Sequence, residues 1–152
     1  MAELQLLLFN ERDVNPEILQ FDIESYEDVL ALWKRCEGVG LSDADSLQAI
    51  RAYLERNPGM SFIARVDGSI VGAVLGGHDG RRGYIHHLAV DIVWRRQGIA
   101  RRLVETCIYA LKEAGIQKIH IFIFNNNVDG IAFWKSVGWE HRSDISVISK
   151  TI

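Results

Sequence analysis

The sequence predicts an α/β domain, of the α+β kind, in which a β-sheet packs against amphipathic helices. Segments typical of strands and helices follow one another in the order β-α-α-β-β-β-α-β-α-β-β over about residues 18–150. Between two strand-like runs, Asp67-Gly68 is typical of a tight hairpin turn, which joins antiparallel strands. A chain of 152 residues is long enough for one domain with a hydrophobic core.

The first half of the chain is predicted to hold two helices followed by the hairpin. Ser25 and Asp28 form a box-like helix start, after which apolar residues recur at helical spacing as far as Gly38. A second helix is expected over 46–56, because Asn57-Pro58-Gly59 follows it as a stop signal. The strands expected here are 18–23, 60–66 and 69–76, and residues 1–17 are expected to form an N-terminal arm or an extra strand.

A strand, a turn and a helix over residues 84–111 organise the second half of the chain. The strand begins at Tyr84, and the helix begins at Gly98 and stops at Gly115, with an apolar stripe wide enough to pack on a sheet. The mostly apolar run 118–124 predicts a buried strand. The remaining expected elements are a short helix at 128–137 and two last strands within 139–152, around a turn at 142–144.

Composition and charge exclude several classes of function. The net charge of -3 argues against general nucleic-acid binding, and no apolar run is long enough to span a membrane. Cys36 and Cys107 lie far apart and suggest no disulfide framework, and the five histidines show no metal-ligand spacing. The apolar start of the chain lacks the basic flank and cleavage site of a signal peptide. We therefore expect a cytoplasmic protein without a metal and without nucleic-acid or membrane partners.

The turn before the helix at Gly98 has the features of an anion-binding site. Arg95, Gly98 and Ala100 fall in the spacing R-x-x-G-x-A where the turn becomes the helix. The first amides of a helix have no partners inside it and carry the positive end of its dipole. Gly98 has no β carbon, so an anion can approach the backbone closely. With the added charge of Arg96 and Arg101, this turn predicts a site for phosphate or pyrophosphate.

The run LAVDIVWRRQGIARRL, from residue 88 to 103, resembles the acetyl-CoA signature Q/R-x-x-G-x-G/A of the GNAT N-acetyltransferases. Residues 127–139 resemble a second family pattern, N-x-x-A-I-x-L-Y-x-x-x-G-F. The runs DVLALWKRCEG and GGHDGRRG are similar to those of the small bacterial YpeA-type members. The resemblance covers about residues 18–150. It implies a single domain over 1–152 with the GNAT acyl-CoA N-acyltransferase fold, a mixed, mostly antiparallel sheet of about six to seven strands flanked by four helices.

The resemblance implies an acyltransferase that moves the acetyl group of acetyl-CoA to a primary amine, of a small molecule or a protein, by direct attack in a ternary complex. The backbone of residues 88–90 would pair with the pantetheine arm, the Val90 N–H would face the thioester carbonyl, and residues 96–101 would bind the pyrophosphate. The implied acetyl-CoA contacts are Leu88, Ala89, Val90, Arg95, Arg96, Gln97, Gly98, Ile99, Ala100, Arg101, Asn127, Phe133 and Trp134. The sequence neither names the acceptor nor distinguishes a monomer from a homodimer.

Deprotonation of the amine requires a base that titrates near neutral pH, for which histidine is best suited. His86 and His87 both lie on the central strand, where neighbours point to opposite faces, so at most one is expected to face the cleft. A bulge in the strand would change this parity. We choose His86, which matches a histidine of the aralkylamine N-acetyltransferases in the shared run H-x-L-A-V. The alternative is a core histidine without a catalytic role.

The chain departs from the family at Trp134, where the resemblance places a tyrosine that protonates the departing sulfur of CoA. An indole N–H donates a hydrogen bond but is no useful acid. CoA can still leave as a thiolate, because a thiol titrates near about 8.5, and Tyr84 is an alternative acid. Asn127 is expected to contact the pantetheine arm, to cap a helix, or to do both. The missing tyrosine keeps a second function open, an acyl-CoA-binding sensor with little or no turnover.

Overall fold

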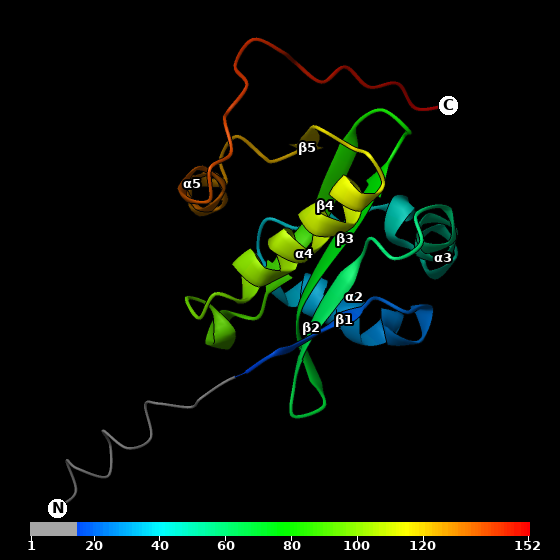
Figure 1. The fold of residues 1–152 in the computed structure, drawn as a ribbon, viewed down its shortest axis with the longest axis vertical. Helices are drawn as coiled ribbons and strands as arrows, with labels where there is room; N and C mark the ends of the chain where they lie inside the picture. Colours follow the sequence, from blue (N-terminus) through cyan, green and yellow to red (C-terminus); the bar gives the residue numbers. More distant parts are fainter. Residues whose placement is uncertain (1–14) are drawn as a thin grey trace, which may run out of the picture. The chain divides into compact units, whose positions relative to one another are not determined.

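The computed structural model describes residues 15–152 and comprises two compact units, and the boundary along the chain falls between Ile121 and Phe122. The first unit contains a five-stranded sheet with the helices α2, α3 and α4, and the second contains α5 and an extended end (Figure 1). The arm or extra strand expected over 1–17 lies almost wholly outside the described residues. None of the helices within 15–152 combines the length and apolar character needed to cross a membrane.

The sheet of the first unit has the strand order β1-β2-β3-β4-β5. Strands β1 to β4 pair antiparallel with their neighbours, and β5 pairs with β4 in parallel, so the sheet is mixed and mostly antiparallel as expected. The predicted hairpin joins β2 to β3, and Asp67 and Gly68 take the positive φ angles of 48° and 79° that such tight turns require. The strands are β1 (Glu17–Gln20), β2 (Phe62–Val66), β3 (Ser69–His78), β4 (Gly83–Val90) and β5 (Ile119–Ile121).

Different helices cover the two faces of the sheet. Helices α2 (Tyr26–Arg35) and α3 (Leu47–Arg56) pack on one face, where Trp33, Ile50 and Cys36 share a buried apolar cluster with Leu75 of β3. Helix α4 (Ile99–Glu113) covers the other face, and its own residue Cys107 is buried. The next residue of β3, Gly76, faces α4, because a β carbon there would lie 3.2 Å from Cys107 Sγ. Both cysteines are free and buried.

The described residues contain fewer strands than the six to seven expected. The apolar run 118–124 yields only the three residues of β5, and their side chains are half-buried rather than buried. After α5 (Val128–Ser136), residues 139–152 form no strand, so the two last strands predicted there are absent. Strand-like sequence alone does not make a strand, because its N–H and C=O groups need a paired neighbour. Ile145, Val147 and Ile148 of this segment are exposed.

Candidate active site

The turn that leads into α4 has the geometry predicted for an anion site. A 3-10 turn, η3 (Ile92–Trp94), precedes it, and the N-cap of α4 is Gly98 with a left-handed φ of 79°. A β carbon at Gly98 would meet no atom within 4 Å, so the space beside the N-cap is open. Within residues 15–152 no side chain caps this helix start. The amides of its first turn therefore keep their capacity to bind an anion.

The arginines of this turn have different surroundings, although all of them are exposed. Arg95 Nε donates a hydrogen bond to the carbonyl oxygen of Val90 at 2.9 Å and so ties the turn to the end of β4. Arg96 has a positive φ of 60°, which is uncommon outside glycine. Arg101 Nε lies 3.1 Å from Glu105 Oε1 in an exposed ion pair one helical turn apart. Such pairs contribute little to stability, so Arg101 can turn towards a phosphate at small cost.

The backbone of residues 88–90, expected to hold the pantetheine arm, continues past the point where β4 and β5 pair. The parallel pairs run from Gly83 and Ile119 to Ile85 and Ile121. Strand β4 extends five residues further, to Val90. A strand edge that outruns its neighbour suits an extended ligand, because its main-chain groups pair with the ligand as with an added strand.

A β-bulge lies in β4 at the two histidines. His86 pairs with Leu75 and Ala89 pairs with Ala73, so His87 and Leu88 together lie opposite one residue of β3. The backbone of His87 is left-handed, with a φ of 50°, which is uncommon for a residue other than glycine.

Both histidines lie on the face of the sheet that α2 and α3 cover. The His86 ring lies edge-on to the ring of Tyr53 on α3, with centroids 6.3 Å apart, and the His87 ring lies edge-on to Trp33 on α2 at 5.0 Å. The expectation that neighbouring residues would point to opposite faces is therefore wrong, because the bulge inserts one residue and interrupts the alternation. Tyr84 lies on the same side, with its ring stacked on His86 at 6.3 Å.

The surroundings of His86 favour a neutral imidazole. Burial lowers the pKa of His86 below its ordinary value, and the nearby His87 lowers it further, whereas the Asp45 carboxylate acts in the opposite direction. At neutral pH the ring is therefore uncharged and able to accept a proton.

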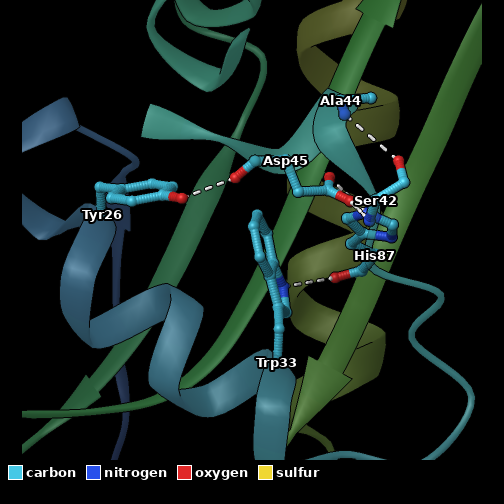
Figure 2. A network of polar contacts seen from close by, with 6 residues as sticks. All are labelled: Tyr26, Trp33, Ser42, Ala44, Asp45 and His87. Atoms are coloured by element: carbon cyan, nitrogen blue, oxygen red, sulfur yellow. Dashed lines mark hydrogen bonds and ion pairs between the residues drawn. The ribbon is translucent and has the colours of Figure 1, made fainter. Parts of the chain in front are cut away.

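A hydrogen-bond network that the sequence did not reveal holds His87 in place (Figure 2). His87 Nε2 lies 2.7 Å from Asp45 Oδ1, and Trp33 Nε1 donates to the His87 carbonyl oxygen at 3.2 Å. Asp45 lies in a 3-10 turn, η2 (Asp43–Asp45), and is buried. The Ser42 N–H donates to Asp45 Oδ2 at 2.9 Å, and the Tyr26 hydroxyl donates to the Asp45 carbonyl oxygen at 2.6 Å. The buried carboxylate thus has a partner at each oxygen.

The sequence carried only a local signal for Asp45. Ser42 and Asp45 have the spacing of a capping box, and the structure forms that box. This pattern indicates a turn but says nothing of a partner in β4, which lies 42 positions further along the chain.

The second unit contains the remaining predicted residues, Asn127, Phe133 and Trp134. Asn127 is the N-cap of α5, and its side-chain oxygen accepts a hydrogen bond from the Gly130 N–H at 2.9 Å, which confirms the predicted cap. Trp134 is buried among aromatic rings, with Phe133 edge-on at 5.3 Å and Trp139 at 4.6 Å. An indole in this setting is a rigid apolar group. Its N–H can donate a hydrogen bond but does not act as an acid.

Comparisons with known proteins identify the family and the fold. The model of the acetyltransferase (GNAT) family matches residues 26–139. A curated acetyltransferase of Sodalis glossinidius (strain morsitans) is 29% identical over 136 residues, which are 90% of this chain and 95% of that protein. The aminoglycoside N-acetyltransferase AAC(6')-Iy, solved in complex with CoA, superposes with a TM-score of 0.75 at 18% identity, covering 93% of this chain and 98% of the other. A GNAT-family acetyltransferase from Staphylococcus aureus Mu50 gives a TM-score of 0.75 at 17% identity, covering 87% and 90%.

Proposed function

The chain belongs to the GNAT acetyltransferase family and is an acyltransferase with acetyl-CoA as co-substrate, and we propose that it acetylates a primary amine by direct attack in a ternary complex. The observation that carries this proposal is the pairing, in one unit, of an open helix N-terminus at Gly98 with a neutral histidine on the strand that leads to it. An amine acceptor is further supported by a structural neighbour, AAC(6')-Iy, which was solved with a bisubstrate analogue of CoA and acetylneamine.

The residues of the α4 turn fit the pyrophosphate of acetyl-CoA. Gly98 leaves open space beside the helix N-cap, and the exposed guanidinium groups of Arg95, Arg96 and Arg101 supply positive charge around it. Gln97, Ile99 and Ala100 belong to the same turn. On their sequence pattern we assign Leu88, Ala89 and Val90, together with Asn127, Phe133 and Trp134, to the pantetheine arm. Acetyl-CoA supplies the activated thioester.

In the proposed reaction the amine nitrogen attacks the thioester carbonyl carbon. His86 first takes one proton from the ammonium and so frees the nitrogen lone pair. A C–N bond then forms, the C–S bond breaks, the sulfur leaves with the bonding electron pair, and the second proton that the nitrogen loses on becoming an amide passes to water. The lowered pKa of His86 suits this role, because only the neutral ring accepts a proton. Trp134 provides no acid, so the thiol leaves as a thiolate, or it takes its proton from Tyr84, whose ring is stacked on His86.

The proposal is tested by two measurements on the same protein. Calorimetric titration with acetyl-CoA gives its affinity, and release of free thiol in the presence of a panel of amines, including aminoglycosides, gives turnover. We expect saturable binding and thiol release with at least one amine. Trp134, in place of the family's tyrosine, favours the second candidate function, an acyl-CoA-binding sensor. Tight binding without thiol release for any amine would establish that function and refute the first.

A further inference from the structure

We propose that Asp45 is a positioning residue for acetyl transfer: by binding His87 it holds the bulge of β4 in the form that presents His86 to the acceptor amine. The inference rests on the proposed function, since it concerns the same site. Asp45 itself acts through His87, with which its side chain makes a hydrogen bond, and not on the substrates.

The bulge contains an unfavourable backbone conformation, which other contacts in the protein must stabilise. His87 adopts a left-handed backbone without being a glycine, and such residues persist only where their surroundings hold them. Two hydrogen bonds hold His87 here. Its ring is hydrogen-bonded to Asp45, and its carbonyl oxygen accepts a hydrogen bond from Trp33 Nε1. Side chains alternate between the two faces along a strand. If the bulge were lost, the pairing of β4 on one side of it would shift by one residue, and the side chains there would point to the opposite face of the sheet. The position of His86 therefore depends on the anchoring of His87.

The chemistry of the pair indicates more than packing. The side chains of Asp45 and His87 are only 8% and 19% exposed, and a buried carboxylate is costly unless it is paired. Oδ2 of Asp45 accepts a hydrogen bond from the Ser42 N–H, so the other carboxylate oxygen, Oδ1, takes His87 as its partner. A carboxylate accepts hydrogen bonds, so Nε2 of His87 is the donor in this pair. A neutral, apolar residue would fill such a place at lower cost if packing were its only role.

The test compares kcat and KM of the full-length chain with those of four variants, Asp45→Ala, Asp45→Asn, His87→Ala and the double variant Asp45→Ala/His87→Ala. The matched control is Asp28→Asn, an exposed carboxylate on α2. We expect kcat of Asp45→Ala to fall by roughly ten- to a hundredfold, as when groups that orient a functional histidine are removed. The KM for acetyl-CoA should rise by a smaller factor than kcat falls, because the α4 turn is untouched and only the neighbouring residues 88–90 are disturbed. Asp45→Asn should lose less, because its amide oxygen still accepts the Nε2 proton.

The double variant measures the coupling between Asp45 and His87. If Asp45 acts through His87, adding Asp45→Ala to His87→Ala causes no further loss, and the two single losses are not additive. Additive losses would overturn the proposal, as would a kcat of Asp45→Ala within about twofold of wild type. A KM for acetyl-CoA that rises by as large a factor as kcat falls, together with early thermal unfolding, would also overturn it by showing a general structural role.

If Asp45→Ala does not fold, kcat and KM of Asp45→Asn are compared with those of wild type instead. Failure of the proposed function is seen separately, as wild type that releases no thiol with any amine. In that event NMR of the imidazole nitrogens decides the inference: wild type should show the proton on His87 Nε2, and Asp45→Asn should shift the signals of both His86 and His87. An unchanged His86 signal would overturn the coupling.

Discussion

Two substitutions at Gly98 test the anion site and separate the effect of the added side chain's shape from the effect of its charge. Asn and Asp have nearly the same shape, and both tolerate the left-handed backbone better than most residues other than glycine. Gly98→Asn and Gly98→Asp therefore share the strain of a φ of 79°, which amounts to about 1–2 kcal/mol. Because a β carbon at this position meets no atom within 4 Å, neither variant should clash with the rest of the chain. The difference between them is one negative charge.

The size of that difference follows from Coulomb's law. Two unit charges about 4 Å apart repel each other by about 1 kcal/mol in water and by about 4 kcal/mol at the effective dielectric constant typical near a protein surface. A carboxylate at position 98, the N-cap of α4, would lie close to a bound pyrophosphate. We therefore expect Gly98→Asp to bind CoA roughly five- to several-hundredfold more weakly than Gly98→Asn.

Calorimetry with CoA measures both variants without turnover. The gap between them should narrow in high salt, since the screening length falls from about 10 Å at 0.1 M to about 3 Å at 1 M. Wild type serves as the reference, and thermal unfolding shows whether each variant is folded. Equal affinities for folded Gly98→Asp and Gly98→Asn at low salt would refute the assignment of the pyrophosphate to this turn.

Three further predictions concern the histidine, the tryptophan and the packing of α4. His86→Ala should lower kcat/KM by about a hundredfold or more. Because burial lowers the pKa of His86, the wild-type rate should rise with pH through a limb below the ordinary histidine value, and a variant profile that keeps this limb would exclude His86 as the base. Trp134→Tyr, which restores a phenol, should release thiol faster than wild type if proton delivery limits turnover and equally fast if amine attack does; slower release would contradict both. Gly76→Ala should destabilise the fold by about 1–3 kcal/mol, since its β carbon would overlap the Met60 carbonyl oxygen and press on Cys107 Sγ. Its melting temperature should fall by roughly 2–4 °C per kcal/mol, and an unchanged value would contradict this packing.

The parts of the site that depend on local backbone geometry could be predicted from the sequence. R-x-x-G-x-A specifies a helix start with an open N-cap, and Gly98 supplies it with no contribution from distant residues. The same holds for Asn127, because a helix cap involves residues only three positions apart. Helix α4 was predicted well for a similar reason, since its apolar stripe repeats within one element.

The parts that depend on two segments could not be predicted. The bulge at His87 is a property of the pairing between β3 and β4, and the alternation rule failed there. The partnership of Asp45 with His87 arises only when the η2 turn packs beside β4. Residues 139–152 show the converse case, since their strand-like composition was recognised but the described residues provide them with no paired strand.

The two thiols give the first unit a pair of internal reporters, one under each helical layer. Cys36 Sγ lies 3.7 Å from the Val90 carbonyl oxygen at the end of β4, and Cys107 Sγ lies 3.2 Å from that of Met60 beneath α4. Burial raises the pKa of both thiols, that of Cys107 to about 12, so the reactive thiolate is scarce while the layers stay closed. The rate at which an alkylating reagent labels each cysteine therefore measures how often its own layer opens. A ligand that orders the end of β4 should slow the labelling of Cys36 selectively, which makes occupancy of the site readable without any catalytic assay.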